Sequence, residues 1–161
     1  MLDAISDFLP IEDFSRLTPR LEQLLVYWRA KRTGSLLPSR KDIDPIDIPR
    51  LMSDVAFLDI MRDPLDYRYR LVGTHIVEMV GHDRTGLRMR EFLTPPAIEA
   101  SAKSIERLIA SREAIAFEGR LYWLQKDYRH FQALVLPLAA DGREVDMAIM
   151  GLNFSPERRT G

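Results

Sequence analysis

The sequence predicts an α+β fold in which helices cover an antiparallel sheet. Short segments with strand-like alternation come in two groups, one between residues 55 and 72 and the other between residues 114 and 154. Helical segments lie between the two groups, whereas a doubly wound parallel sheet would alternate strands and helices one by one. The 161 residues, 46% apolar and 29% charged, have the length and composition of one globular domain with a real core.

Net charge and cysteine content exclude several classes of function. A formal net charge of -1 gives no overall positive field for nucleic acid or an anionic membrane. The chain contains no cysteine, which rules out disulfides, thiolate nucleophiles and thiolate metal sites. The longest apolar run, residues 133–140, is too short to span a bilayer. Asp3 and Asp7 lie where a secretory signal would need a basic and then an apolar stretch, so we expect a cytoplasmic protein.

Residues 18–34 contain the clearest predicted helix. Thr18 stands at the cap, Pro19 in the first turn and Gly34 after the last turn. The apolar residues that share one face of this helix are Leu21, Leu24, Leu25 and Trp28. Because such a stripe is costly in water, it must pack on the body of the domain or on a second protomer. We predict a homodimer through this helix.

A connector is predicted between this helix and the main body, because three prolines interrupt residues 38–49. Asp42, Asp44 and Asp47 invite a calcium interpretation, but the loop lacks its central glycine and its final glutamate. We interpret these aspartates as caps and turn formers. The predicted organisation is a helical arm and connector over residues 1–53, a domain over residues 54–156 and a frayed tail over residues 157–161.

The body is predicted to hold five strands and one long helix. Residues 55–61 and 67–72 form a hairpin, because apolar and charged residues alternate in its second strand. A threonine cap and two prolines begin the long helix over residues 94–112. The three remaining strands are expected within residues 114–123, 128–139 and 145–154.

The stretches "LLVYWRAKRTGSLLPSRKDIDPIDIPRLM" and "YRYRLVGTHIVEMVGHDRTG" make the comparison with a known family specific. Together with the order of elements, they resemble a family of compact, stand-alone bacterial PAS proteins of the alphaproteobacterial type. The resemblance implies a five-stranded antiparallel sheet of order 2-1-5-4-3, helices that enclose a pocket, and dimerisation through helices outside the core. It also implies a sensory or protein-interaction role, without naming a ligand.

The candidate ligand-binding residues are Tyr69, His75, Phe117, Trp123 and Phe131. The four aromatic residues are placed on the core side of their strands by alternation, so plain core packing is the alternative interpretation.

His75, Glu78 and His82 are spaced so that a continuous helix would present all three on one side, as a shared metal ion would need. The alternative is that Gly81 ends the helix and that these residues are polar groups on a wet face. Acid–base catalysis by either histidine with Glu78 or Asp83 is chemically possible. No further catalytic motif supports it, and we predict neither a catalytic residue nor a metal site.

The cofactor is left unidentified by the sequence. His130, in a predicted strand, could ligate haem as in some PAS domains, or it could be a hydrogen-bonded strand residue. Light-sensing PAS photochemistry through a cysteinyl–flavin adduct is excluded, because there is no cysteine. Arg84, Arg88 and Arg90 form the densest basic patch, which we interpret as a solvated face and not as a nucleic-acid site.

Two functions from different classes remain. In the first, the chain is a PAS-type sensory module without intrinsic catalysis, which binds a small ligand or a signalling protein and signals through its N-terminal helical arm. In the second, it is a small enzyme that uses a histidine and a carboxylate in an enclosed cavity. We expect the first.

Overall fold

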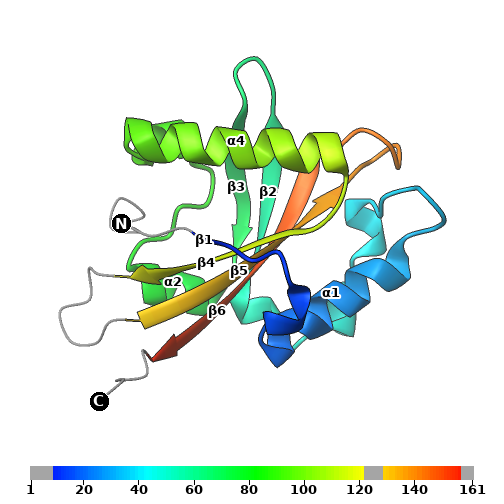
Figure 1. Cartoon of the computed structure of the whole chain (residues 1–161), viewed down its shortest axis with the longest axis horizontal. Helices are drawn as coiled ribbons and strands as arrows, with labels where there is room; N and C mark the ends of the chain where they lie inside the picture. The colour runs from blue at the N-terminus through cyan, green and yellow to red at the C-terminus, as the bar shows by residue number, and fades with distance from the viewer. Residues whose placement is uncertain (1–8, 122–128, 157–161) are drawn as a thin grey trace.

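A six-stranded antiparallel sheet forms the centre of the molecule (Figure 1). The computed structural model describes residues 9–121 and 129–156. The strands are β1 (Leu9–Pro10), β2 (Val55–Met61), β3 (Asp66–Val72), β4 (Ile115–Leu121), β5 (Arg129–Leu138) and β6 (Met147–Pro156). Their spatial order is β1-β4-β5-β6-β2-β3. The five predicted strands thus pair in the predicted order 2-1-5-4-3, and β1 adds a short sixth strand to the edge of β4.

Four α-helices and several 3-10 turns surround the sheet in the described residues. The α-helices are α1 (Pro19–Lys31), α2 (Thr74–Val80), α3 (Met89–Phe92) and α4 (Pro95–Ser111). The 3-10 turns are η2 (Phe14–Arg16), η3 (Arg40–Asp42), η4 (Pro45–Asp47) and η5 (Met52–Asp54). In Figure 1, α4 crosses β2 and β3, while α1 lies at the other end of the molecule. None of the described helices has the length and apolar character needed to cross a membrane.

Helices α1 and α2 contact opposite faces of the sheet. A side chain at Gly151 of β6 would point at Leu24 of α1, whereas Phe154, three residues later in the same strand, meets the ring of His75 in α2. Successive residues of a strand point to opposite faces, so positions 151 and 154 lie on different faces. We call the face toward α1 the outer face and the face toward α2 the inner face.

The apolar stripe of α1 is buried against the outer face of its own chain. Leu21, Leu24, Leu25 and Trp28 are only 1–3% exposed and belong to the main core. The indole Nε1 of Trp28 donates to the carbonyl of Pro137 in β5, 2.9 Å away. The stripe therefore packs on the body, the first of the two locations expected from the sequence. These four side chains are not available to a second protomer in this arrangement, and the homodimer itself stays a prediction.

Burial of β5 on both faces follows from this packing. All residues from Phe131 to Ala139 are buried, although only alternate side chains can point to one face. Those facing α1 include Leu134, which pairs with Gly151 in the next strand. The continuous apolar run of this strand, unlike the alternation of β3, is thus explained by a sheet covered on both sides.

Gly151 is required by the close approach of α1 to β6. A Cβ atom at this position would lie 2.6 Å from Cδ2 of Leu24 and 3.0 Å from Cδ2 of Leu21. Leu24 is 1% exposed, so its side chain has little room to move away. The absence of a side chain at position 151 therefore sets the distance between helix and sheet.

We expect Gly151→Ala to lower the free energy of unfolding by about 1–3 kcal/mol, because the added methyl group overpacks a filled interface. Urea denaturation followed by circular dichroism measures this change. Leu24→Ala removes the obstructing side chain, so Gly151→Ala should cost much less in that background. Equal costs in the two backgrounds would show that the contact with Leu24 does not set the helix position.

Candidate functional site

An aromatic cluster lies on the inner face at the β4–β5–β6 end of the sheet. Phe131 and Ala133 are buried there, and three partly buried side chains pack around them: Phe117, Leu152 and Phe154. The rings of Phe117 and Phe131 meet edge to face, with their centroids 6.5 Å apart. Two predicted ligand residues, Phe117 and Phe131, are therefore neighbours on the predicted face.

His75 joins this cluster from α2. Its ring meets Phe154 edge to face at a centroid distance of 5.7 Å. The histidine is partly exposed, and α2 ends at Gly81, which has the left-handed conformation (φ 84°) expected of a helix stop. His75 therefore reaches the inner face from a short helix of two turns.

Tyr69, another predicted ligand residue, belongs to a second aromatic group on β3. Its ring stacks on Phe92 of α3 at 5.9 Å and meets Tyr67 edge to face at 5.4 Å. Arg84 lies over the ring of Phe92, with its guanidinium carbon 4.1 Å from the ring centre. Trp123, the remaining predicted ligand residue, lies outside the described residues.

Burial raises the pKa of both tyrosine hydroxyls from their ordinary value of 10.0, and raises that of Tyr67 well above it. The positive charge of Arg84 acts in the opposite direction on both, which indicates that the guanidinium is near the two hydroxyls. This half of the inner face therefore combines neutral phenols with a cation.

Two cavities in the described part of the chain lie elsewhere. The larger, of about 400 Å³, is lined by residues 62–65 of the β2–β3 turn and by Glu106, Ile109 and Ala110 of α4. The smaller, of about 90 Å³, lies between η2 and the start of β4. Neither is lined by a predicted ligand residue, so ligand binding by those residues stays a prediction.

A buried carboxylate connects helices from the two faces. Asp54, 7% exposed, precedes β2 and therefore lies at the end of the sheet, where it can reach both α1 and α2. One oxygen contacts Nδ1 of His75, and the other lies 3.1 Å from Nη2 of Arg20. Arg20 also donates to the carbonyl of Arg50, 2.5 Å away. We call Arg20, Asp54 and His75 the Asp54 bridge.

Gly73 allows the two sides of this bridge to approach. A Cβ atom at Gly73 would lie 2.3 Å from the carbonyl oxygen of Ser53, next to Asp54. The φ angle of Gly73 is -62°, so any residue could adopt its conformation, and close approach alone requires glycine. The glycine at this turn is therefore explained by the contact with Ser53 and not by backbone conformation. Gly73 is also the N-cap of α2.

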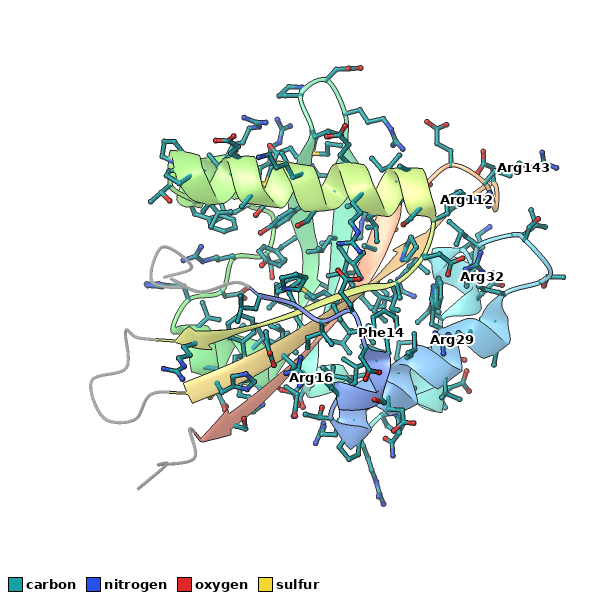
Figure 2. All side chains as sticks on the ribbon, in the orientation of Figure 1. Phe14, Arg16, Arg29, Arg32, Arg112 and Arg143 are labelled. Carbon is teal, nitrogen blue, oxygen red and sulfur yellow. The ribbon has the colours of Figure 1, made fainter. Side chains whose placement is uncertain are left out.

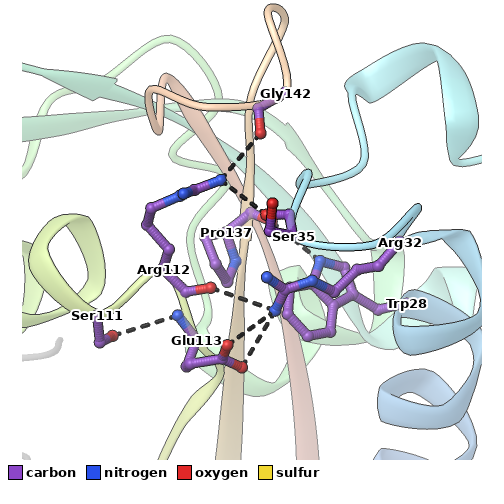
Figure 3. Close-up of polar contacts among 8 residues, drawn as sticks. All are labelled: Trp28, Arg32, Ser35, Ser111, Arg112, Glu113, Pro137 and Gly142. Carbon is purple, nitrogen blue, oxygen red and sulfur yellow. Dashed lines mark hydrogen bonds and ion pairs between the residues drawn. The ribbon is translucent and has the colours of Figure 1, made fainter.

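A second set of polar contacts holds the other end of α1, as Figure 3 shows. Nη2 of Arg112 donates to the carbonyls of Ser35 (2.9 Å) and Gly142 (3.1 Å), which joins the end of α4 to the segment after α1 and to the β5–β6 turn. Arg32 pairs with both carboxylate oxygens of Glu113 at 3.1 Å and stacks on Trp28. Figure 2 places Arg32 and Arg112 in a row of arginines along this side of the molecule.

Other polar candidates from the sequence have structural roles. Helix α2 contains His75 and Glu78 but ends before His82, so the three residues do not share one continuous helix, and Glu78 and His82 are exposed. The described residues contain no cluster of three or more histidine, cysteine or acidic side chains that could hold a metal ion. His130 pairs with Glu118 at 3.4 Å and faces outward, on the side opposite Phe131. Asp42 and Asp44 cap 3-10 turns, as predicted.

The sequence patterns did not indicate a role for Asp54 or Arg20, and the predicted exposure of Arg84 was wrong. A lone aspartate before a strand and an arginine in a first helical turn are common surface residues, and only the packing of α1 brings them together. Arg84 was predicted to lie on a solvated face, but it is 5% exposed. The loop that contains Arg84 pairs with β3, because the backbone N–H of Gly86 donates to the carbonyl of Tyr69, 2.7 Å away. This pairing holds the loop against the domain and buries the arginine.

Comparison with known proteins gives the family. A family model described as PAS domain matches residues 17–153. The chain belongs to this PAS domain family. The family predicted from the sequence is thereby confirmed, as is the α+β PAS-like fold. The match includes α1, in agreement with the packing of this helix on the PAS sheet.

Two solved structures share backbone similarity with this PAS domain. The crystal structure of a Rhodobacter sphaeroides LOV protein matches with a TM-score of 0.47 and 12% identity, over 74% of this chain and 71% of that one. An RNA-binding light-oxygen-voltage receptor matches with a TM-score of 0.46 and 14% identity, over 91% of this chain and 37% of that one. This chain therefore spans little more than a third of the receptor. No curated protein sequence matches it significantly.

The buried tyrosines predict a loss of stability at high pH. Their pKa values are raised in the folded state, so the folded protein holds protons that the unfolded chain releases above pH 10.0. The stabilising contribution is complete below that pH and falls as the pH rises toward the folded-state values. Urea denaturation at a series of alkaline pH values should show this decline, and the double variant Tyr67→Phe, Tyr69→Phe should flatten it. An unchanged slope in the variant would assign the decline to other groups.

Proposed function

We propose that this PAS domain is a sensory module in which occupancy of the inner face, by a small ligand or a signalling partner, changes how α1 packs on the outer face. This chain belongs to the PAS domain family, whose members are typically sensors without catalysis. The observation that carries the proposal is the Asp54 bridge, because it gives a continuous path of contacts from the inner face to α1.

Each step of this path rests on a named contact. Phe154 belongs to the inner-face cluster and touches the ring of His75. His75 contacts one oxygen of Asp54, and the other oxygen pairs with Arg20 of α1. A ligand that moves Phe154 or α2 would change the geometry at Asp54, and the buried carboxylate would favour a new position of Arg20.

The response should be a shift of α1 and not its release. Burial of each large apolar side chain of the stripe contributes roughly 1.5–3 kcal/mol, so undocking all four would cost as much as an entire small domain has in stability. The Asp54 bridge acts on the first turn of α1 only, where Arg20 is located. A change confined to that turn costs far less and is accessible to a ligand of ordinary affinity.

The contact between His75 and Asp54 is also the combination of groups that a small acid–base enzyme would use. This second function has less support, because the other oxygen of Asp54 is held by Arg20 and neither described cavity adjoins the pair. An enzyme would lose turnover in His75→Ala while its helices stayed unchanged. A sensory module would show the altered α1 described next.

We expect His75→Ala to raise amide hydrogen exchange in the first turns of α1, residues 22–26, because His75 is linked to Arg20 of that helix through Asp54. The increase should be roughly three- to tenfold, as loss of one partly exposed hydrogen bond worth about 1 kcal/mol would give. Exchange measured by mass spectrometry resolves these amides.

Glu78→Ala is the matched control, because Glu78 is an exposed residue of the same helix. It should leave exchange in α1 unchanged. If His75→Ala altered exchange only within α2, the proposed path through Asp54 would be wrong.

A further inference from the structure

Arg84 is a buried cation with no anion paired to it in the described part of the chain. Its side chain is 5% exposed, and Nη1 is fully buried with no hydrogen-bond partner. Within the described residues, no hydrogen bond or ion pair involves the Arg84 guanidinium. Its one close contact of known geometry is the face of Phe92, at 4.1 Å.

This arrangement is unfavourable for the free protein. A guanidinium taken out of water loses its hydration, and proteins compensate with a carboxylate or a set of hydrogen bonds. Stacking on an aromatic ring offsets only part of the penalty for a buried unpaired charge. The nearest acidic group of the strand, Asp66, lies 3.8 Å from Nε of Arg90. A compensating anion for Arg84 is therefore missing from the described residues.

We propose that Arg84 is the anchor for a small organic carboxylate bound on the inner face, with its oxygens on the guanidinium and its apolar part against Phe92 and Tyr69. The two rings are stacked, which provides an apolar wall beside the cation. The planar guanidinium can donate two parallel hydrogen bonds to the two oxygens of one carboxylate. The inference rests on the proposed sensory function and names the chemical class of its ligand.

The charge balance favours a monoanion over phosphate. Arg84 is the single unpaired cation of this group, and the neighbouring Tyr67 and Tyr69 are neutral donors. Asp66, 5% exposed, adds a negative charge close to Tyr67, which would repel a second negative charge on the ligand. A carboxylate matches one guanidinium, whereas a phosphate dianion would leave one charge uncompensated.

Benzoate binding to the full chain tests this site. Sodium benzoate is titrated while the Nε–Hε resonance of Arg84, assigned by its loss in Arg84→Lys, is followed by NMR. Benzamide, which has the same ring without the charge, sodium chloride and sodium phosphate at equal ionic strength are the comparison solutes. We expect benzoate to shift the Arg84 resonance in a saturable way and the comparison solutes to leave it in place.

Arg84→Met should weaken benzoate binding by about tenfold or more, the loss expected for charge-assisted hydrogen bonds. Thermal denaturation with and without benzoate measures this in the variant. The matched control is Arg88→Met, because Arg88 is an exposed residue of the same loop. It should bind benzoate like the unchanged protein.

Three outcomes would overturn the proposal: no saturable shift with benzoate, an equal shift with phosphate or chloride, or full benzoate stabilisation retained in Arg84→Met. The NMR titration of the unchanged protein decides the first two even if a variant fails to fold. The hydrogen-exchange test of the Asp54 bridge uses no ligand, so the carboxylate site and the sensory path can fail independently.

Discussion

The packing of α1 on the outer face is the constraint on which the rest of the structure depends. Helix and sheet meet at Gly151, where even a methyl group would collide with Leu24. Because α1 covers this face, β5 is buried on both sides from Phe131 onward and can carry the continuous apolar run of residues 133–138. Without α1, Leu134 and its neighbours on the same face would be exposed to water. The helix is therefore part of the folded domain and not an independent arm.

Having helices on both faces creates a need for connections around the ends of the sheet. At one end, Asp54 pairs with Arg20 of α1 and His75 of α2. At the other, Arg112 joins the end of α4 to the backbone after α1 and to the β5–β6 turn (Figure 3). Both connections consist of polar contacts, and hydrogen-bond and salt-bridge networks are among the structures that carry coupling between sites. The ends of α1 are thus the places where events on the inner face could reach the outer one.

The inner face carries two groups of different chemistry. The cluster around Phe131 is apolar and adjoins His75, whereas the stack of Tyr67, Tyr69 and Phe92 contains the buried Arg84. An apolar group needs no further partner, but a buried guanidinium does. This energetic imbalance at Arg84 is the observation on which the proposed carboxylate site rests.

Periodicity and turn residues in the sequence determined the elements, because these are local properties. The alternation in β3, the proline start of α4 and the stop at Gly81 each depend on a few neighbouring residues, and all lie where they were predicted. The family resemblance added the strand order, which no local pattern contains. The apolar stripe of α1 predicted that one face of the helix is buried, but it did not show whether the sheet or a second protomer covers that face.

Only the tertiary structure decided the partners of polar residues. Asp54 and His75 are 21 residues apart, and the packing of α1 and the close approach at Gly73 bring Arg20, Asp54 and His75 together. The residues that flank Arg84 in the sequence are typical of a surface loop. Arg84 is nevertheless buried, because that loop pairs with β3. Long-range contacts depend on how whole elements pack, so neither spacing nor residue type could reveal them.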